Sequence, residues 1–107
     1  VEKGSLQYKV EEFTDEAVVK ISGWALNRKT LRAGTLNIVL TGQDKQQYIV
    51  KSERLYRPDV RDAFGKRRLA FAGFEAAFIK QNLPKQHYEV SLVLDGDARM
   101  VGSIVVA

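Results

Sequence analysis

Apolar and polar residues alternate with a period of two over most of this sequence, and this alternation limits what the chain can fold into. Successive side chains of a strand point to opposite faces, so the pattern is typical of strands that are buried on one face. No segment repeats apolar residues at helical spacing over three turns, which disfavours a helical bundle. The alternation predicts strands in residues 6–10, 17–25, 36–41, 46–52, 88–94 and 100–106, with Phe74, Ala76 and Phe78 marking one more.

Short polar segments between these runs predict tight turns. Polar segments at residues 14–16 and 42–45 join the first four runs into two expected hairpins. The dipeptide Asp95-Gly96 joins the last two runs, and it favours a type I′ turn because both residue types tolerate a positive φ. Neighbouring strands are therefore expected to pair in antiparallel fashion.

The pattern of strands and turns predicts an all-β fold with six to eight strands. Two antiparallel sheets packed face to face, as in an immunoglobulin-like β-sandwich, fit best, and a small β-barrel is the alternative. Residues 58–64 are the one segment expected to form a helical turn, because Pro58 suits a first turn and Asp59 meets free amide groups there. The 107 residues are expected to form a single domain, residues 1–107.

Composition narrows the classes of function. The chain has no cysteine, which excludes a disulfide scaffold, a thiolate zinc site and a thiol nucleophile. Its net charge of +4 favours polyanions weakly, and no apolar run approaches the length of about 20 residues that spans a bilayer. The sequence begins at Val1 and ends at Ala107 within an apolar alternation, which predicts a domain excised from a larger protein.

No group of residues predicts an active site. The only histidine, His87, has no G-x-S-x-G serine motif to act with, and its neighbours offer no set of metal ligands. The D-x-D sequence at residues 95–97 is better explained by a hairpin turn than by a bound cation. Asp59 and Asp62 lie beside arginines that would hold both pKa values down, so neither suits the role of a general acid. We therefore predict no catalytic residue, no metal site and no cofactor.

Five cations lie close together in the middle of the chain, with two carboxylates among them. One interpretation is a solvated loop whose arginines pair with nearby acids. The other is a patch for phosphate or carboxylate groups of a polymer, which arginine binds through paired hydrogen bonds. The candidate binding residues are Arg57, Arg61, Lys66, Arg67 and Arg68.

Three aromatic residues are further candidates for a binding surface. Trp24, Tyr48 and Tyr56 would provide a platform for sugar rings if they lay on one face. The alternation places Trp24 with Lys20 and Ser22, on the face opposite Val19 and Gly23. The alternative is that Trp24 covers the end of the core, as large aromatic residues often do.

Four short motifs occur in a recognisable order: ISGWAL at residues 21–26, RPDV at 57–60, AGF at 72–74 and HYEVSLVL at 87–94. In order and spacing they resemble a β-sandwich accessory domain of bacterial cell-surface polysaccharide glycosyltransferases and teichoic-acid glycerophosphotransferases. The resemblance implies that Arg57 and Asp59 tie a crossing loop to the sandwich and that Phe74 is buried. The segment Lys66-Arg67-Arg68 departs from this pattern, and we expect any binding surface to lie there.

The resemblance also implies a function. The domain would be a non-catalytic module beside a transferase domain, docking the enzyme, its partner or its polymer. Its partners would be that transferase domain, an anionic cell-envelope polymer or glycan, and a second copy if the module self-associates. The location would be cytoplasmic, at the inner face of the membrane. A stand-alone carbohydrate-binding module is the alternative, and a barrel binding single-stranded nucleic acid is a third reading, which the low density of basic residues disfavours.

Overall fold

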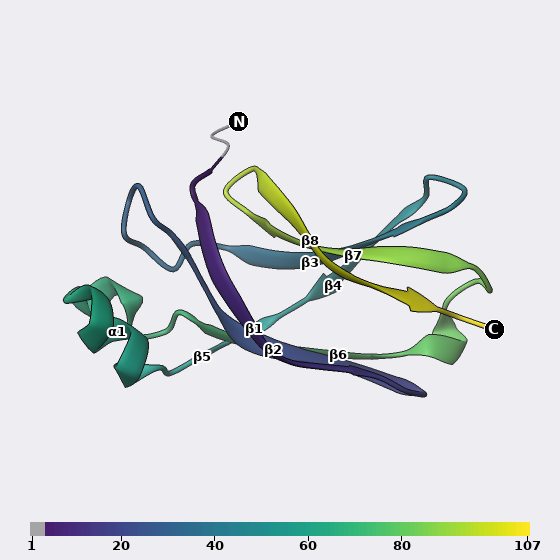
Figure 1. Ribbon diagram of the computed structural model, residues 1–107, viewed down its shortest axis with the longest axis horizontal. Helices are drawn as coiled ribbons and strands as arrows, with labels where there is room; N and C mark the ends of the chain where they lie inside the picture. The colour runs from purple at the N-terminus through teal and green to yellow at the C-terminus, as the bar shows by residue number, and fades with distance from the viewer. Residues whose placement is uncertain (1–3) are drawn as a thin grey trace.

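Two four-stranded antiparallel sheets pack face to face in the computed structural model, which describes residues 4–107 (Figure 1). In spatial order, the first sheet contains β1 (Leu6–Asp15), β2 (Val18–Asn27), β6 (Gly73–Ile79) and β5 (Glu53–Leu55). The second contains β4 (Gln47–Lys51), β3 (Leu36–Gly42), β7 (His87–Leu94) and β8 (Asp97–Val105). The prediction of an all-β, two-sheet sandwich is confirmed, and within residues 4–107 the strands do not close into a barrel.

The three predicted hairpins are present as β1–β2, β3–β4 and β7–β8. The turn between β7 and β8 consists of Asp95 and Gly96, with φ values of 49° and 84°. Two successive residues with positive φ define the predicted type I′ turn. Asp97, directly after this turn, is buried and accepts hydrogen bonds from the main-chain N–H groups of Gly4 (3.0 Å) and Leu6 (2.9 Å). This carboxylate therefore fastens the start of β1 to the second sheet.

The main core lies between the two sheets and is formed by the inward faces of their strands. Successive residues of β7 alternate between exposed or half-buried and buried positions, so the period-two pattern of the sequence reports the core face directly. The largest fully buried side chains of this core are Tyr88, Phe74, Ile21, Ile38, Leu40, Leu92, Leu94 and Ile104. The expected burial of Phe74 is thus observed.

A second, smaller apolar cluster lies on the outer face of the first sheet. Ile21 and Ala25 of β2 point into the main core, whereas Trp24 and Leu26 lie on the opposite face. The segment between β5 and β6 covers this face. The members of the cluster are Leu26, Val60, Leu69 and Ala72, with Trp24 and Phe64 packed against them.

The structure contains several elements that the sequence did not predict. After Ser52 the chain leaves the second sheet and adds the three-residue strand β5 to the first, and the Ser52 hydroxyl donates a hydrogen bond to the Leu36 carbonyl at this crossing (2.9 Å). The short 3-10 helices η1 (Arg67–Leu69) and η2 (Lys80–Asn82) lie on either side of β6. The predicted helical turn is confirmed as α1 (Pro58–Phe64).

Candidate functional site

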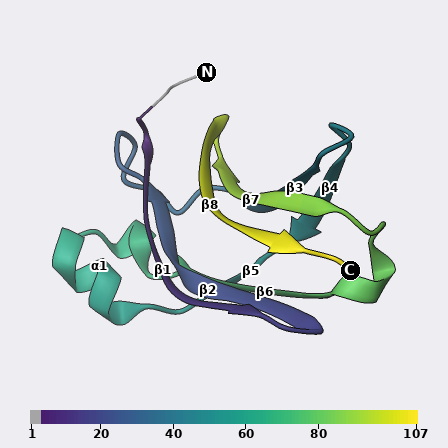
Figure 2. The same ribbon diagram turned by 45° about the vertical axis from the view of Figure 1, so that its right-hand side comes forward.

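The segment that connects β5 to β6 carries most of the candidate binding residues. It contains α1 and η1 and lies at one end of the sandwich, at the left in both ribbon views (Figures 1 and 2). We call residues 56–72 the excursion. Pro58 stands in the first turn of α1, and Gly65 ends the helix with a φ of 66°. The N–H groups of Gly65 and Lys66 satisfy the carbonyls of Asp62 and Arg61, which closes the helix and turns the chain toward η1.

Arg57 joins the excursion to the edge strand β1. Its guanidinium donates two hydrogen bonds to the Asp59 carboxylate (2.9 and 2.8 Å) and two more to the carboxylate of Glu11. Arg57 lowers the pKa of Asp59 to about 2 through these hydrogen bonds, and it lowers the pKa of Glu11 in the same way. Arg57 thus pairs with two carboxylates and fastens the excursion to β1.

Arg54 secures the base of the excursion from the other side. Its guanidinium donates hydrogen bonds to the carbonyls of Ala25 (2.8 Å) and Ala72 (3.3 Å), and also to that of Ala33. Ala25 belongs to β2, and Ala72 is the last residue of the excursion. A half-buried cation therefore joins β5, β2 and the returning chain through main-chain acceptors.

Arg61 lies between an acid and an aromatic ring. Its Nε donates a hydrogen bond to Asp62 (3.1 Å), and its Nη1 donates to the Tyr56 hydroxyl (3.1 Å). The guanidinium carbon lies 5.8 Å from the centre of the Tyr56 ring, a cation–π distance. Asp62 and Tyr56 raise the pKa of Arg61, so this side chain stays charged. The Arg61 side chain remains partly exposed.

Lys66, Arg67 and Arg68 differ from the other two cations of the predicted group. All three are exposed, and within residues 4–107 none of them forms an ion pair. We call these three residues together with Arg61 the basic surface. A hollow of about 430 Å³ lies in it, lined by Arg61, Asp62, Gly65, Lys66 and Arg67. Three cations against one carboxylate give this hollow a positive lining.

The structure does not bring the three predicted aromatic residues together. Trp24 is half-buried in the second cluster and meets Phe64 edge to face, with 6.1 Å between ring centres. Tyr48 packs against Tyr88 of the main core at 5.9 Å. Only Tyr56 lies on the excursion with the cations. The interpretation of Trp24 as a residue that covers apolar structure agrees with its position.

Sequence reasoning missed Phe71 as a member of this surface. The rings of Tyr56 and Phe71 are 5.6 Å apart, and the two residues are 54% and 57% exposed. Phe71 belongs to no alternating run and precedes the buried Phe74 by three residues. That position outside the strand pattern is the signal that could have marked it as a surface residue.

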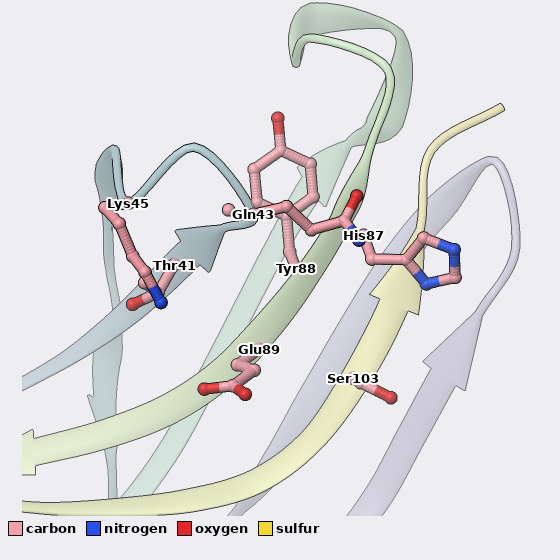
Figure 3. Close-up of a pocket in the computed structure, with 8 residues that line it drawn as sticks. Thr41, Gln43, Lys45, His87, Tyr88, Glu89 and Ser103 are labelled. Carbon is pink, nitrogen blue, oxygen red and sulfur yellow. The ribbon is translucent and has the colours of Figure 1, made fainter.

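A second hollow of about 410 Å³ lies at the turn between β3 and β4 (Figure 3). Thr41, Glu89 and Ser103 pair side by side across three strands at its floor, and His87 and Lys45 stand at its rim. In Figure 3 the side chains of Glu89 and Ser103 point away from each other. Among the described residues no hydrogen bond joins His87 to Glu89 or Ser103.

No family model, curated protein or solved structure matches this chain. In the part of the chain that the structure describes, no cluster of three or more histidine, aspartate or glutamate side chains is arranged to hold a metal ion. No helix of residues 4–107 has the length and apolar character needed to cross a membrane. We therefore base the proposed function on the exposed charged and aromatic residues.

Proposed function

We propose that this domain is a non-catalytic accessory module of a cell-envelope glycan or teichoic-acid assembly transferase, and that it docks the enzyme to an anionic polymer. The observation that carries the docking role is the set of three exposed cations, Lys66, Arg67 and Arg68, without ion pairs in the described chain. The resemblance of the four sequence motifs supports the transferase context. In that context the module works at the cytoplasmic face of the membrane, beside the transferase domain.

The charges of the basic surface suit phosphate or carboxylate groups. Arginine presents a planar fork that binds either group through paired hydrogen bonds, and lysine adds a compact positive charge. Like charges held close together repel one another, and an anionic ligand removes that repulsion on binding. The basic surface is therefore complementary to a polymer that carries an anionic group on each repeat.

The fold holds the main chain that carries these cations in place before any ligand arrives. The second cluster packs the excursion onto the first sheet, and Arg57 ties the start of α1 to β1 through Glu11. Binding by a pre-ordered surface loses less conformational entropy than binding by a mobile loop. The ordered main chain of the excursion therefore supports a docking role.

Binding of long-chain inorganic polyphosphate and of a glycerol-phosphate teichoic acid, followed by fluorescence anisotropy, tests the docking role. The test variant combines Lys66→Ala, Arg67→Ala and Arg68→Ala. The control combines Lys20→Ala, Lys51→Ala and Lys85→Ala, which removes the same charge from exposed positions outside the excursion. We expect the test variant alone to lose most of its affinity, and the slope of log K against log salt to fall by about 2, as three lost phosphate contacts predict.

Two results would contradict the proposal. The absence of binding by the unmodified protein at low salt would remove the docking role. Equal losses in the test and control variants would show that net charge, rather than the basic surface, attracts the polymers. The transferase context is tested separately by assaying the domain together with its adjoining chain for transfer of sugar or glycerol phosphate. We expect a neighbouring catalytic domain to carry out that transfer.

A further inference from the structure

The exposed pair Tyr56 and Phe71 adds a second kind of contact beside the basic surface. Each ring is more than half exposed, although aromatic side chains of this size contribute most when they are buried. Apart from each other and Arg61, the two rings have no aromatic or cationic partner in residues 4–107. Adjacent exposed aromatic rings provide an apolar area that a ligand can cover.

Backbone hydrogen bonds at the base of the excursion place these two rings together. The ladder between β5 and β6 ends with Leu55 opposite Gly73. Beyond it the Arg57 N–H donates a hydrogen bond to the Ala70 carbonyl (2.6 Å), so the chain entering the excursion runs alongside the chain leaving it. Tyr56 and Phe71 are the residues next to this bond on the two sides. The pair is thus held by backbone hydrogen bonds and does not depend on a flexible loop.

We infer that Tyr56 and Phe71 form a sugar-stacking subsite next to the basic surface, so that the ligand is a polymer of anionic sugars. This inference rests on the proposed function. Arg61 links the two parts, because its guanidinium contacts Tyr56 and lines the positive hollow. A sugar ring that bears a carboxylate or phosphate presents an apolar face of C–H groups to the aromatic rings and its charge to the cations.

The charges around the pair argue against the other occupants. A second copy of the chain would bring two sets of unpaired cations together, which costs energy. A nucleobase cannot be sandwiched between the two rings, because their centres are only 5.6 Å apart and their planes are tilted by 53°. A base stacked on one ring is distinguished by the binding test below. A polymer without rings, such as polyphosphate, would use the cations and leave the aromatic pair uncovered.

Two polyanions separate the parts of this site: oligogalacturonate, which carries one carboxylate on each sugar ring, and inorganic polyphosphate, which has no ring. We expect Phe71→Ala to weaken oligogalacturonate binding about three- to ten-fold, the range that one aromatic contact supplies, and to leave polyphosphate binding unchanged. Phe71→Trp should retain the affinity. Ile49→Ala, at a 68% exposed position of the second sheet, serves as the matched apolar control and should alter neither.

The outcomes distinguish this inference from the proposed function. If both polymers bind and Phe71→Ala weakens both equally or neither, the stacking subsite is refuted while docking to polyanions stands. If neither polymer binds the unmodified protein, the proposed function itself fails. If oligothymidylate of equal charge binds more tightly than oligogalacturonate and is the ligand that Phe71→Ala weakens, the surface recognises nucleic acid and the sugar assignment is wrong. Thermal unfolding of each variant checks that the fold is intact.

Discussion

Truncation of Leu69 to alanine tests whether the second apolar cluster holds the excursion on the sandwich. Leu69 of the excursion is fully buried against the outer face of β2, in a cluster with Leu26, Val60 and Ala72. The substitution removes three carbon groups, worth about 2.4 kcal/mol in lost burial, and leaves a cavity that adds to the cost. We expect the free energy of unfolding to fall by about 3 to 4 kcal/mol.

Urea denaturation followed by tryptophan fluorescence measures this loss, because Trp24 lies in the same cluster. Ile49→Ala, which removes a similar group from an exposed position, should change the free energy of unfolding by less than about 0.5 kcal/mol. Hydrogen exchange of the α1 amides should also accelerate, since the helix is too short to be stable without packing. A loss below about 1 kcal/mol in Leu69→Ala, with unchanged exchange in α1, would refute this role of the cluster.

Two further substitutions test other fixed points of the fold. Asp97→Asn should lower the free energy of unfolding by about 2 to 4 kcal/mol near neutral pH, because two main-chain N–H groups lose their carboxylate acceptor. Those hydrogen bonds lower the pKa of Asp97, so its contribution to the free energy of unfolding is present above about pH 4 and is lost as the pH falls further. The difference between variant and parent in urea denaturation should therefore narrow on acidification. A difference that stays constant with pH would contradict this. Gly23→Ala would place a Cβ atom 2.0 Å from the Lys9 carbonyl oxygen in the neighbouring strand and should lower the free energy of unfolding by about 3 kcal/mol or more. Gly65→Ala has open space around its Cβ and should lower it by only about 1 to 2 kcal/mol, because of the positive φ. Similar thermal midpoints in the two variants would argue against the close approach at Gly23.

The alternation of the sequence was enough to predict most of the sandwich. The pattern in β7, for example, determines which of its side chains face the core, and Asp95-Gly96 fixes the register of the last hairpin. Local chemistry also predicted α1, whose first turn contains Pro58 and Asp59. These features depend on residues that are close in the sequence, so a pattern within the chain reports them.

The strand β5 and the tie at Arg57 depend on distant residues, and local patterns cannot report them. Residues 53–55 are a strand only because β6 offers a free edge after the chain has crossed from one sheet to the other. The resemblance gave Arg57 a tying role with Asp59, but the carboxylate that reaches across to the sandwich is Glu11, which is 46 positions away. Pairing at such separations is decided by tertiary structure.

The candidate site was predicted in part for the same reason. The sequence places Lys66, Arg67 and Arg68 together because they are consecutive, and the structure leaves all three exposed. The sequence could not show which of the nearby arginines form ion pairs with carboxylates. The partnership of Tyr56 with Phe71 was also hidden, since it arises from the hydrogen bond that closes the base of the excursion.

A two-dimensional NMR titration of the isotope-labelled domain with oligogalacturonate at low salt tests most directly whether the excursion is the binding surface. We expect the largest amide shifts to map to the excursion, at Lys66, Arg67, Arg68 and Phe71, and to saturate together with one dissociation constant. Shifts scattered over cations of both sheets, or centred on the hollow beside His87, would contradict the claim that the excursion is the binding surface.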